Sequence, residues 1–246
     1  MGFLGDLWNS ILYIPIINTM VGVYQFLPFE NFGVTIILFT LLTRVILWPL
    51  SRKNRAYREA MQQIQPELEK LKKKHAKDKE KLYAETMKLY TKYKVNPASG
   101  CLPLLIQLPF TFALYQALRE GLNPERIETL NNLLYSFIPK VTFFNTNFLW
   151  FDLTKTDPFY ILPVLVAGLQ YLQVKMSMGN LSEEAAKASK QTMIYMPLIF
   201  LFISLSLPSG LTLYILLTTI SGIVENKGLR AILGGKSKEQ SNQLEV

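Results

Sequence analysis

Phe32 to Leu50 reads FGVTIILFTLLTRVILWPL, a stretch of 19 residues that is almost wholly apolar and contains Arg44. This is about the length that an α-helix needs to cross a bilayer core. An arginine keeps its proton there, at a cost of roughly 2.5–3.5 kcal/mol on insertion scales. Its long side chain could reach part of the way to the membrane surface. Thr40 and Thr43 precede it and Trp48 follows one turn later, so we interpret this polar row as a wet, functional surface within the membrane.

The composition indicates a membrane protein. Half of the residues are hydrophobic and the mean hydropathy is +0.19, although 18% of the residues are charged. The charges must therefore be segregated from the apolar segments. The pattern predicts an all-α polytopic membrane protein with five transmembrane helices, a cytoplasmic helical hairpin and an N-terminal interfacial helix. The predicted membrane spans cover residues 32–50, 101–118, 158–174, 191–207 and 209–224.

The N-terminal segment, residues 1–31, is apolar but interrupted. It contains Pro15, Asn18, Pro28 and Glu30, and it has neither a basic start nor a convincing small-residue cleavage site. These features argue against a removable signal peptide and against a regular membrane span. We predict an extracytoplasmic helix that lies in the membrane interface.

The basic residues predict the orientation. Residues 1–31 contain no Lys or Arg, whereas residues 51–97 contain 14, against six acidic residues. By the positive-inside rule, residues 51–97, the loop 175–190 and the basic tail 225–246 are cytoplasmic, and the loop 119–157 is extracytoplasmic. This predicts an N-out, C-in protein.

The basic segment has its own helical pattern. Apolar residues recur in steps of four and three, and a polar break at residues 76–80 separates two such runs, which predicts the hairpin. Pro66 should kink or restart the first helix. The exposed bases could contact anionic lipid headgroups, the ribosome or a client protein, and the sequence leaves these alternatives open. The candidate contact residues are Arg52, Arg55, Arg58, Lys72, Lys73 and Lys74. The runs are Tyr57, Met61, Ile64, Leu68, Leu71 and His75, then Leu82, Thr86, Leu89 and Tyr93.

Enzyme chemistry has little support. His75 is the only histidine and Cys101 the only cysteine, and the sequence has no phosphate loop of the GxxxxGK[ST] type. We therefore expect no enzymatic activity, no cofactor and no bound metal. Neutral polar residues do occur in the predicted spans, where they could form contacts between helices or, with Arg44, an amphiphilic groove. They are Gln107, Thr111, Gln170, Gln173, Thr212, Thr218, Thr219 and Ser221.

Four blocks resemble the YidC/Oxa1/Alb3 family of membrane protein insertases, in the order in which that family has them. They are Thr40–Pro49 (TLLTRVILWP), Val95–Tyr115 (VNPASGCLPLLIQLPFTFALY), Phe148–Pro163 (FLWFDLTKTDPFYILP) and Pro208–Tyr214 (PSGLTLY). The resemblance covers nearly the whole chain. It implies five spans, a cytoplasmic hairpin after the first, and a hydrophilic groove around Arg44 that opens to the cytoplasm. It also implies the compact bacterial form, without a large extracytoplasmic domain.

The resemblance further implies roles for single residues. Arg44 matches the groove arginine of the family, Thr40 a groove-facing polar position, Gln107 a second-span motif, and Tyr214 an aromatic position that contacts the client helix. The expected function is a bacterial plasma-membrane insertase that works without ATP on nascent membrane proteins. Its expected partners are these clients, the lipid bilayer, the ribosome, the Sec translocon and the signal-recognition-particle machinery. A small-anion transporter or channel is the alternative, and a scaffold that only assembles complexes is the third reading.

Overall fold

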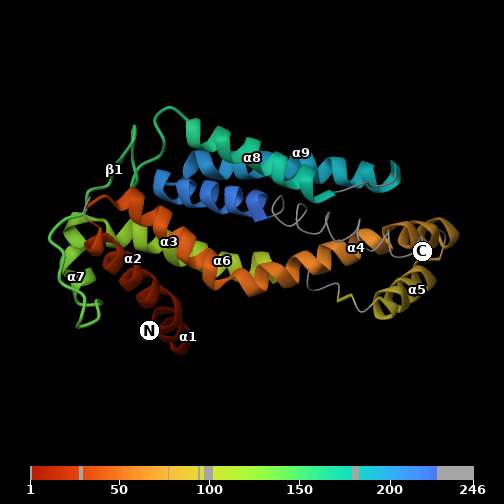
Figure 1. Cartoon of the computed structure of the whole chain (residues 1–246), viewed down its shortest axis with the longest axis horizontal. Helices are drawn as coiled ribbons and strands as arrows, with labels where there is room; N and C mark the ends of the chain where they lie inside the picture. Colours follow the sequence, from red (N-terminus) through yellow and green to blue (C-terminus); the bar gives the residue numbers. More distant parts are fainter. Residues whose placement is uncertain are drawn as a thin grey trace, which may run out of the picture.

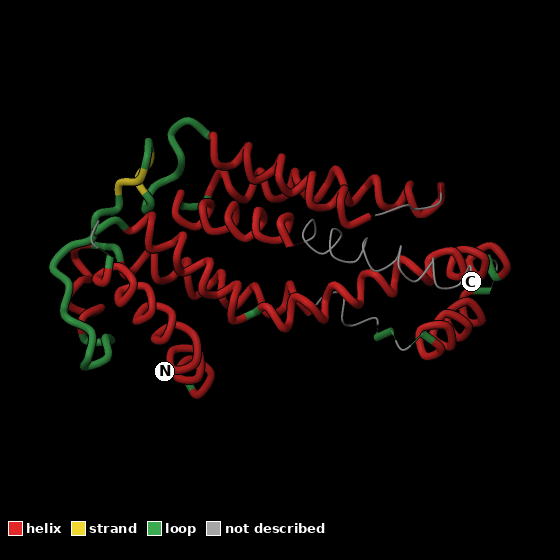
Figure 2. Tube along the Cα trace, in the orientation of Figure 1, coloured by secondary structure: helices red, strands yellow, loops and turns green. Residues whose placement is uncertain are grey.

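The computed structural model describes residues 2–27, 30–76, 78–93, 95–96, 102–178 and 183–225. This part of the chain is an elongated helical bundle (Figures 1 and 2). A segment of loops and short helices closes one end. A pair of charged helices extends from the other end. We call residues 122–160 the cap, and helices α4 and α5 the hairpin.

The chain begins with one continuous helical stretch. It comprises α1 (Phe3–Trp8), a π-helical turn η1 (Asn9–Tyr13) and α2 (Ile14–Phe26). The sequence predicted an interrupted segment here, but the helical stretch continues through Pro15, which directly follows the π-helical turn η1. By length and composition, Gly5–Phe26 is sufficient to cross a membrane. The interfacial placement of this segment stays a prediction.

Helix α3 (Phe32–Ile46) carries Arg44 and continues almost directly into the hairpin. Asn31 caps its start, because the side-chain oxygen accepts hydrogen bonds from the backbone of Gly33 at 2.9 Å and Val34 at 3.3 Å. After Leu47, α4 (Trp48–Lys74) runs through Pro66 as one helix, so the proline does not restart it, and the alternative, a kink, stays a prediction. The hairpin helix thus begins inside the predicted span 32–50.

The hairpin has a small apolar core of its own. Helix α5 (Lys79–Lys92) packs on α4 through a cluster of Ile64, Leu68 and Leu89, which Val95 joins from beyond the end of α5; Tyr57, Met61 and Leu71 pack against this cluster. The first run of the predicted pattern therefore does face the partner helix. In the second run Leu89 is buried, but Tyr90 rather than Tyr93 joins the cluster.

The second predicted span is α6 (Leu102–Gln116), which continues into a π-helical turn η3 (Ala117–Gly121). The cap follows and has more structure than the predicted loop 119–157. It contains the 3-10 turn η4 (Pro124–Arg126), helix α7 (Ile127–Asn131) and the antiparallel strands β1 (Asn147–Phe148) and β2 (Phe151–Asp152).

The remaining helices form a layer beside α3. Helices α8 (Ile161–Met178) and α9 (Glu183–Ser206) pack along each other, and the helix Ser209–Glu225 lies between them and α3 (Figure 1). We call Ser209–Glu225 the central helix. The predicted loop 175–190 is helical at both of its described ends, because α8 extends to Met178 and α9 begins at Glu183, while its cytoplasmic location stays a prediction. Residues 183–190 read EEAAKASK, and alanine, glutamate and lysine favour helix.

The central helix is the core of the bundle. Its buried residues come from all sides: Leu211, Leu213, Tyr214 and Leu216 contribute to the main apolar cluster, and Ser209, Thr212 and Thr219 are buried polar residues. At its start the cap supplies acceptors for backbone N–H groups that have no partner within the helix. Ser209 donates to the carbonyl of Lys155 at 2.6 Å, and Gly210 to that of Leu153 at 3.0 Å.

Two glycines permit the cap to approach the helices. A Cβ atom at Gly33 would lie 2.2 Å from the Phe148 ring, and one at Gly210 would lie 3.0 Å from the carbonyl oxygen of Leu153. Any side chain at Gly33 would displace β1. The cap is therefore seated on the ends of α3 and of the central helix.

Side chains of the cap and of α2 reinforce this seating. Asn18, which is buried, donates to the carbonyl of Leu133 at 2.9 Å and accepts from the backbone of Tyr135 at 2.6 Å. Asp157, also buried, accepts from the Trp150 indole and from the backbone of Leu162. The sequence alone gave neither residue such a role.

The outer surface of the bundle is apolar. Large hydrophobic side chains are exposed along α3, α6, α8 and α9, among them Leu41, Val45, Phe112, Leu165 and Phe202. Soluble proteins rarely expose contiguous apolar surface on this scale, whereas a bilayer covers it.

Candidate functional site

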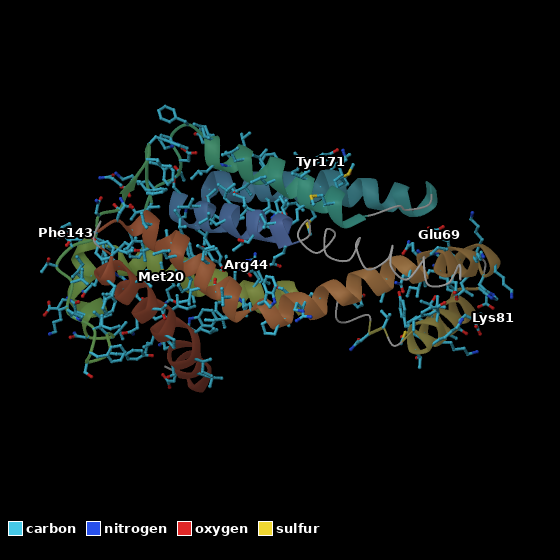
Figure 3. All side chains as sticks on the ribbon, in the orientation of Figure 1. Met20, Arg44, Glu69, Lys81, Phe143 and Tyr171 are labelled. Atoms are coloured by element: carbon cyan, nitrogen blue, oxygen red, sulfur yellow. The ribbon has the colours of Figure 1, made fainter. Side chains whose placement is uncertain are left out.

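Arg44 lies in the last turn of α3, midway along the molecule (Figure 3). Its side chain is 24% exposed and points to the central helix. There the Nη2 atom donates a hydrogen bond of 2.6 Å to the backbone carbonyl of Thr218. A guanidinium can donate five such bonds. This contact therefore positions the charge and leaves it capacity for further acceptors.

A carboxylate stands beside the same guanidinium. The Nη1 atom of Arg44 is 4.0 Å from Oε1 of Glu225, whose side chain is 13% exposed. Thr218 and Glu225 are seven residues apart, two helical turns, and so share one face of the central helix. The sequence analysis did not include Glu225 in the site, because nothing in the local pattern shows that this position faces a helix 180 residues earlier.

Gln107 and Tyr214 meet near this cluster. The Gln107 side-chain amide donates to the Tyr214 hydroxyl at 2.6 Å, which joins α6 to the central helix one turn before Thr218. Tyr214 is only 3% exposed. Thr111 is half-buried and donates to the backbone carbonyl of Gln107 at 3.0 Å, within α6. The structure thus brings Arg44 and Gln107 to the central helix, where their partners Thr218 and Tyr214 are one turn apart; we call these four residues the polar row.

Thr40 and Thr43 are not part of this row. Both side chains are buried, and their hydroxyls donate to carbonyls of α3 itself, those of Ile36 at 2.7 Å and of Thr40 at 2.9 Å. Thr43 lines a pocket of about 220 Å³ between α3 and the N-terminal helices, together with Ile11 and Phe110. We expected these two threonines to form a water-exposed polar surface with Arg44. In the structure their hydroxyls instead donate to carbonyls of the same helix.

Gln170 and Gln173 lie on another side of the central helix. The Gln170 amide donates to the Thr219 hydroxyl at 3.2 Å. Gln173 lies against Gly222, where an added Cβ atom would be 2.4 Å from its amide nitrogen. These two glutamines hold α8 to the central helix, which is the role of interhelical polar contacts in membranes.

Four of the six candidate contact residues of the hairpin lie on its surface. Arg52, Lys72, Lys73 and Lys74 are exposed, and the side chains of Arg55 and Arg58 lie outside the described part. A pocket of about 540 Å³ opens between α4 and α5, and lysines and glutamates surround its apolar floor. They are Glu67, Lys70, Lys74, Glu85, Lys88 and Lys92.

A metal centre is not indicated in the described part of the chain. Within it, no group of three or more His, Cys, Asp or Glu side chains could hold a metal ion. Cys101 and the basic tail after Glu225 lie outside the described residues. The chemistry that this arrangement offers is binding, through one fixed cation and a row of neutral polar groups.

Comparison with known proteins gives a consistent result. The sequence profile described as 60Kd inner membrane protein matches residues 23–233. A protein of Fusobacterium nucleatum subsp. nucleatum named membrane protein insertase YidC is 40% identical over 196 residues, 79% of this chain and 84% of that protein. A protein of the same name from Nitratidesulfovibrio vulgaris (strain DSM 19637 / Miyazaki F) is 38% identical over 219 residues, 89% of this chain. That alignment covers 38% of the Nitratidesulfovibrio protein, so the chain spans well under half of its length.

A solved structure supports the same assignment. It is described as an active YidC insertase crystal structure with the first transmembrane domain resolved, and it superposes with a TM-score of 0.58 at 26% sequence identity. The match covers 93% of this chain and 47% of the solved one. The expected helical, membrane-type fold is thereby confirmed, while the number of spans stays a prediction. The chain belongs to the 60Kd inner membrane protein family, which confirms its resemblance to YidC.

Proposed function

We propose that the chain is a membrane protein insertase. In this proposal it receives nascent membrane proteins in a hydrophilic groove centred on Arg44 and open to the cytoplasm, and releases their helices into the bilayer without ATP. The main observation behind this proposal is that Arg44, a permanently charged residue, is 24% exposed in the middle of an apolar bundle. Such a residue is costly in a membrane and marks a functional site by default. The names of the YidC relatives give the class of activity.

The contacts of Arg44 suggest how a client is held. The guanidinium is fixed by the Thr218 carbonyl, and the Gln107–Tyr214 pair extends the polar row along the central helix. A hydrophilic client segment bound there would traverse part of the bilayer on polar groups. Its following apolar helix would then enter lipid, which is favourable by about 25 cal/mol per Å² of apolar surface. This burial drives release sideways.

The two ends of the molecule suggest the orientation. The hairpin with its exposed Lys72, Lys73 and Lys74 lies at the opposite end from the cap (Figure 1). We therefore place the hairpin in the bacterial cytoplasm and the cap outside, with the chain N-out and C-in. The proposed partners at the cytoplasmic end are nascent clients, the ribosome, the signal-recognition-particle machinery and the Sec translocon. The basic side chains suit anionic partners there.

The experiment is insertion of a short single-span client into liposomes that contain the purified chain. The client carries an acidic outer segment, and anion flux is measured in parallel. Arg44→Ala should lower insertion about tenfold or more, the order expected when a charged hydrogen-bond partner is lost. Arg44→Lys should retain part of the activity if the positive charge matters more than the planar arrangement of the guanidinium donors.

The matched control is Arg119→Ala, which removes the same charge from an exposed side chain in η3, the turn that continues α6 towards the cap. It should leave insertion at the wild-type level. Insertion by Arg44→Ala equal to wild type for every acidic client would reject the electrostatic role. Anion flux that depends on Arg44 without any insertion would favour a transporter or channel instead.

A further inference from the structure

Arg44 already faces a carboxylate of its own chain. Glu225 stands 4.0 Å from the guanidinium, on the same face of the central helix as Thr218. A client with an acidic segment would bring a second carboxylate to the same cation. The two anions have the same chemistry, so they compete for one site.

The geometry of the pair favours exchange. A charge-assisted N–H···O contact is ordinarily about 2.7–2.9 Å long. The Arg44–Glu225 distance of 4.0 Å is longer, and both side chains are partly exposed, at 24% and 13%. Separating a pair at this distance gives up less electrostatic attraction than separating a close charge-assisted contact. By contrast, the 2.6 Å bond to the Thr218 carbonyl is short and would keep the guanidinium in place while its carboxylate partner changes.

The position of Glu225 also allows it to leave. It directly follows the predicted span 209–224, and its side chain is 13% exposed. A carboxylate displaced from Arg44 at this depth can rehydrate without crossing the apolar part of the bundle. The exchange would therefore expose no unpaired charge to lipid.

We propose that Glu225 is a specificity-determining residue: a built-in competing carboxylate that sets how acidic a client segment must be to engage Arg44. This inference rests on the proposed insertase function. While Glu225 neutralises Arg44, weakly acidic or neutral segments gain little from the cation. An acidic segment must displace Glu225 before it gains from the cation, so the pair lowers the advantage that acidic segments have over neutral ones.

The test uses Glu225→Gln, which keeps the shape of the side chain and removes its charge. Two peptides identical except for Asp and Glu in one and Asn and Gln in the other are bound to the full chain in nanodiscs. The matching pair of single-span clients is inserted into liposomes. Glu225→Gln should raise the acidic-to-neutral ratio of affinities and of insertion by about twofold to fivefold, the range for one partly exposed ion pair.

A double-mutant cycle shows whether this change acts through Arg44. In an Arg44→Ala background, Glu225→Gln should leave the ratio unchanged. Glu128→Gln, which removes an exposed carboxylate from the cap, is the control for net charge and should also leave it unchanged. An unchanged ratio in Glu225→Gln, or an equal rise in the Arg44→Ala background, would overturn the inference.

The two proposals fail in different ways. If the wild-type chain inserts neither client, the insertase function fails and the role of Glu225 falls with it. If the wild type inserts the acidic client and Glu225→Gln does not alter the ratio, only the role of Glu225 is rejected.

Discussion

The cap and the hairpin are fixed to the bundle in opposite ways. The cap is bound through buried side chains and backbone groups that join distant segments, such as Asn18 to Leu133 and Ser209 to Lys155. The hairpin is joined through α4, which follows α3 directly, and its own core is the small cluster around Ile64 and Leu89. The Lys88–Glu85 ion pair lies on the surface of the hairpin.

This difference separates two tasks. The cap holds the starts of α3 and of the central helix, and these two helices carry Arg44 and its partners. A change in the cap therefore bears on the geometry of the charged site. The hairpin can present its bases, or change its own stability, with little consequence for that geometry. We expect the two regions to respond separately to mutation, because stability is distributed over local cooperative units.

The largest expected effect is in the core of the hairpin. Ile64 is fully buried, and Ile64→Ala should destabilise the hairpin by about 3 kcal/mol through lost burial and the cavity left behind. Hydrogen exchange over residues 60–92 should accelerate, while the thermal midpoint of the bundle stays the same. Met87→Ala, at a residue that is 37% exposed on α5, is the control and should change little. A bundle midpoint that falls in parallel would mean that hairpin and bundle unfold together.

The next effect is in the cap. Asp157 accepts hydrogen bonds from the Trp150 indole at 3.1 Å and from the backbone of Phe159 at 3.2 Å and Leu162 at 2.7 Å. Asp157→Ala leaves these donors without their charged acceptor and should cost about 2–3 kcal/mol. The thermal midpoint of the bundle should fall, with hydrogen exchange in the hairpin unchanged. The exposed neighbour Thr156 supplies the control, Thr156→Ala. Equal midpoints for the two variants would contradict our description of the cap.

The smallest effect is a pH dependence confined to the cap. Burial raises the pKa of Asp152, but hydrogen bonds from the Thr154 backbone and hydroxyl, with Thr146 and Lys155, outweigh it, and the pKa lies below its usual value. A lowered folded-state pKa means that this stabilisation is present above the unfolded value of about 3.9 and is lost as the pH falls through the folded value. The emission of Trp150, with Trp8 and Trp48 replaced by Phe, should shift over that acid range.

Two variants isolate the source of this shift. Asp152→Asn should remove the part of the emission change that comes from this carboxylate. In the hairpin, the hydrogen bond and charge of Lys88 lower the pKa of Glu85, but that carboxylate is on α5, at the opposite end of the molecule from the cap (Figure 1). Glu85→Gln should therefore leave the acid response of Trp150 as it is. If the Trp150 emission of Asp152→Asn and of its parent changed identically with pH, the prediction would be wrong.

Much of the architecture could be predicted from local patterns. The apolar runs, the step pattern of Tyr57 to Leu71 and the four motif blocks indicated the helices, the hairpin and the family. Where the predicted secondary structure differed from the observed one, the cause was again a local sequence feature. Residues 183–190 are polar, which suggested a loop, yet their composition favours helix. Pro15 and Pro66 suggested interruptions, yet both are accommodated within helices.

What the sequence determined by itself is which segments are apolar, which are charged, and that one arginine is placed among apolar residues. Periodicity and composition act over a few turns, so they are visible without a fold. Only the tertiary structure decided which groups meet: that Arg44 faces Thr218 and Glu225, that Gln107 reaches Tyr214, and that Gln170 serves a different interface. These contacts join residues 49 to about 180 positions apart, and their existence depends on how whole helices pack rather than on any local preference.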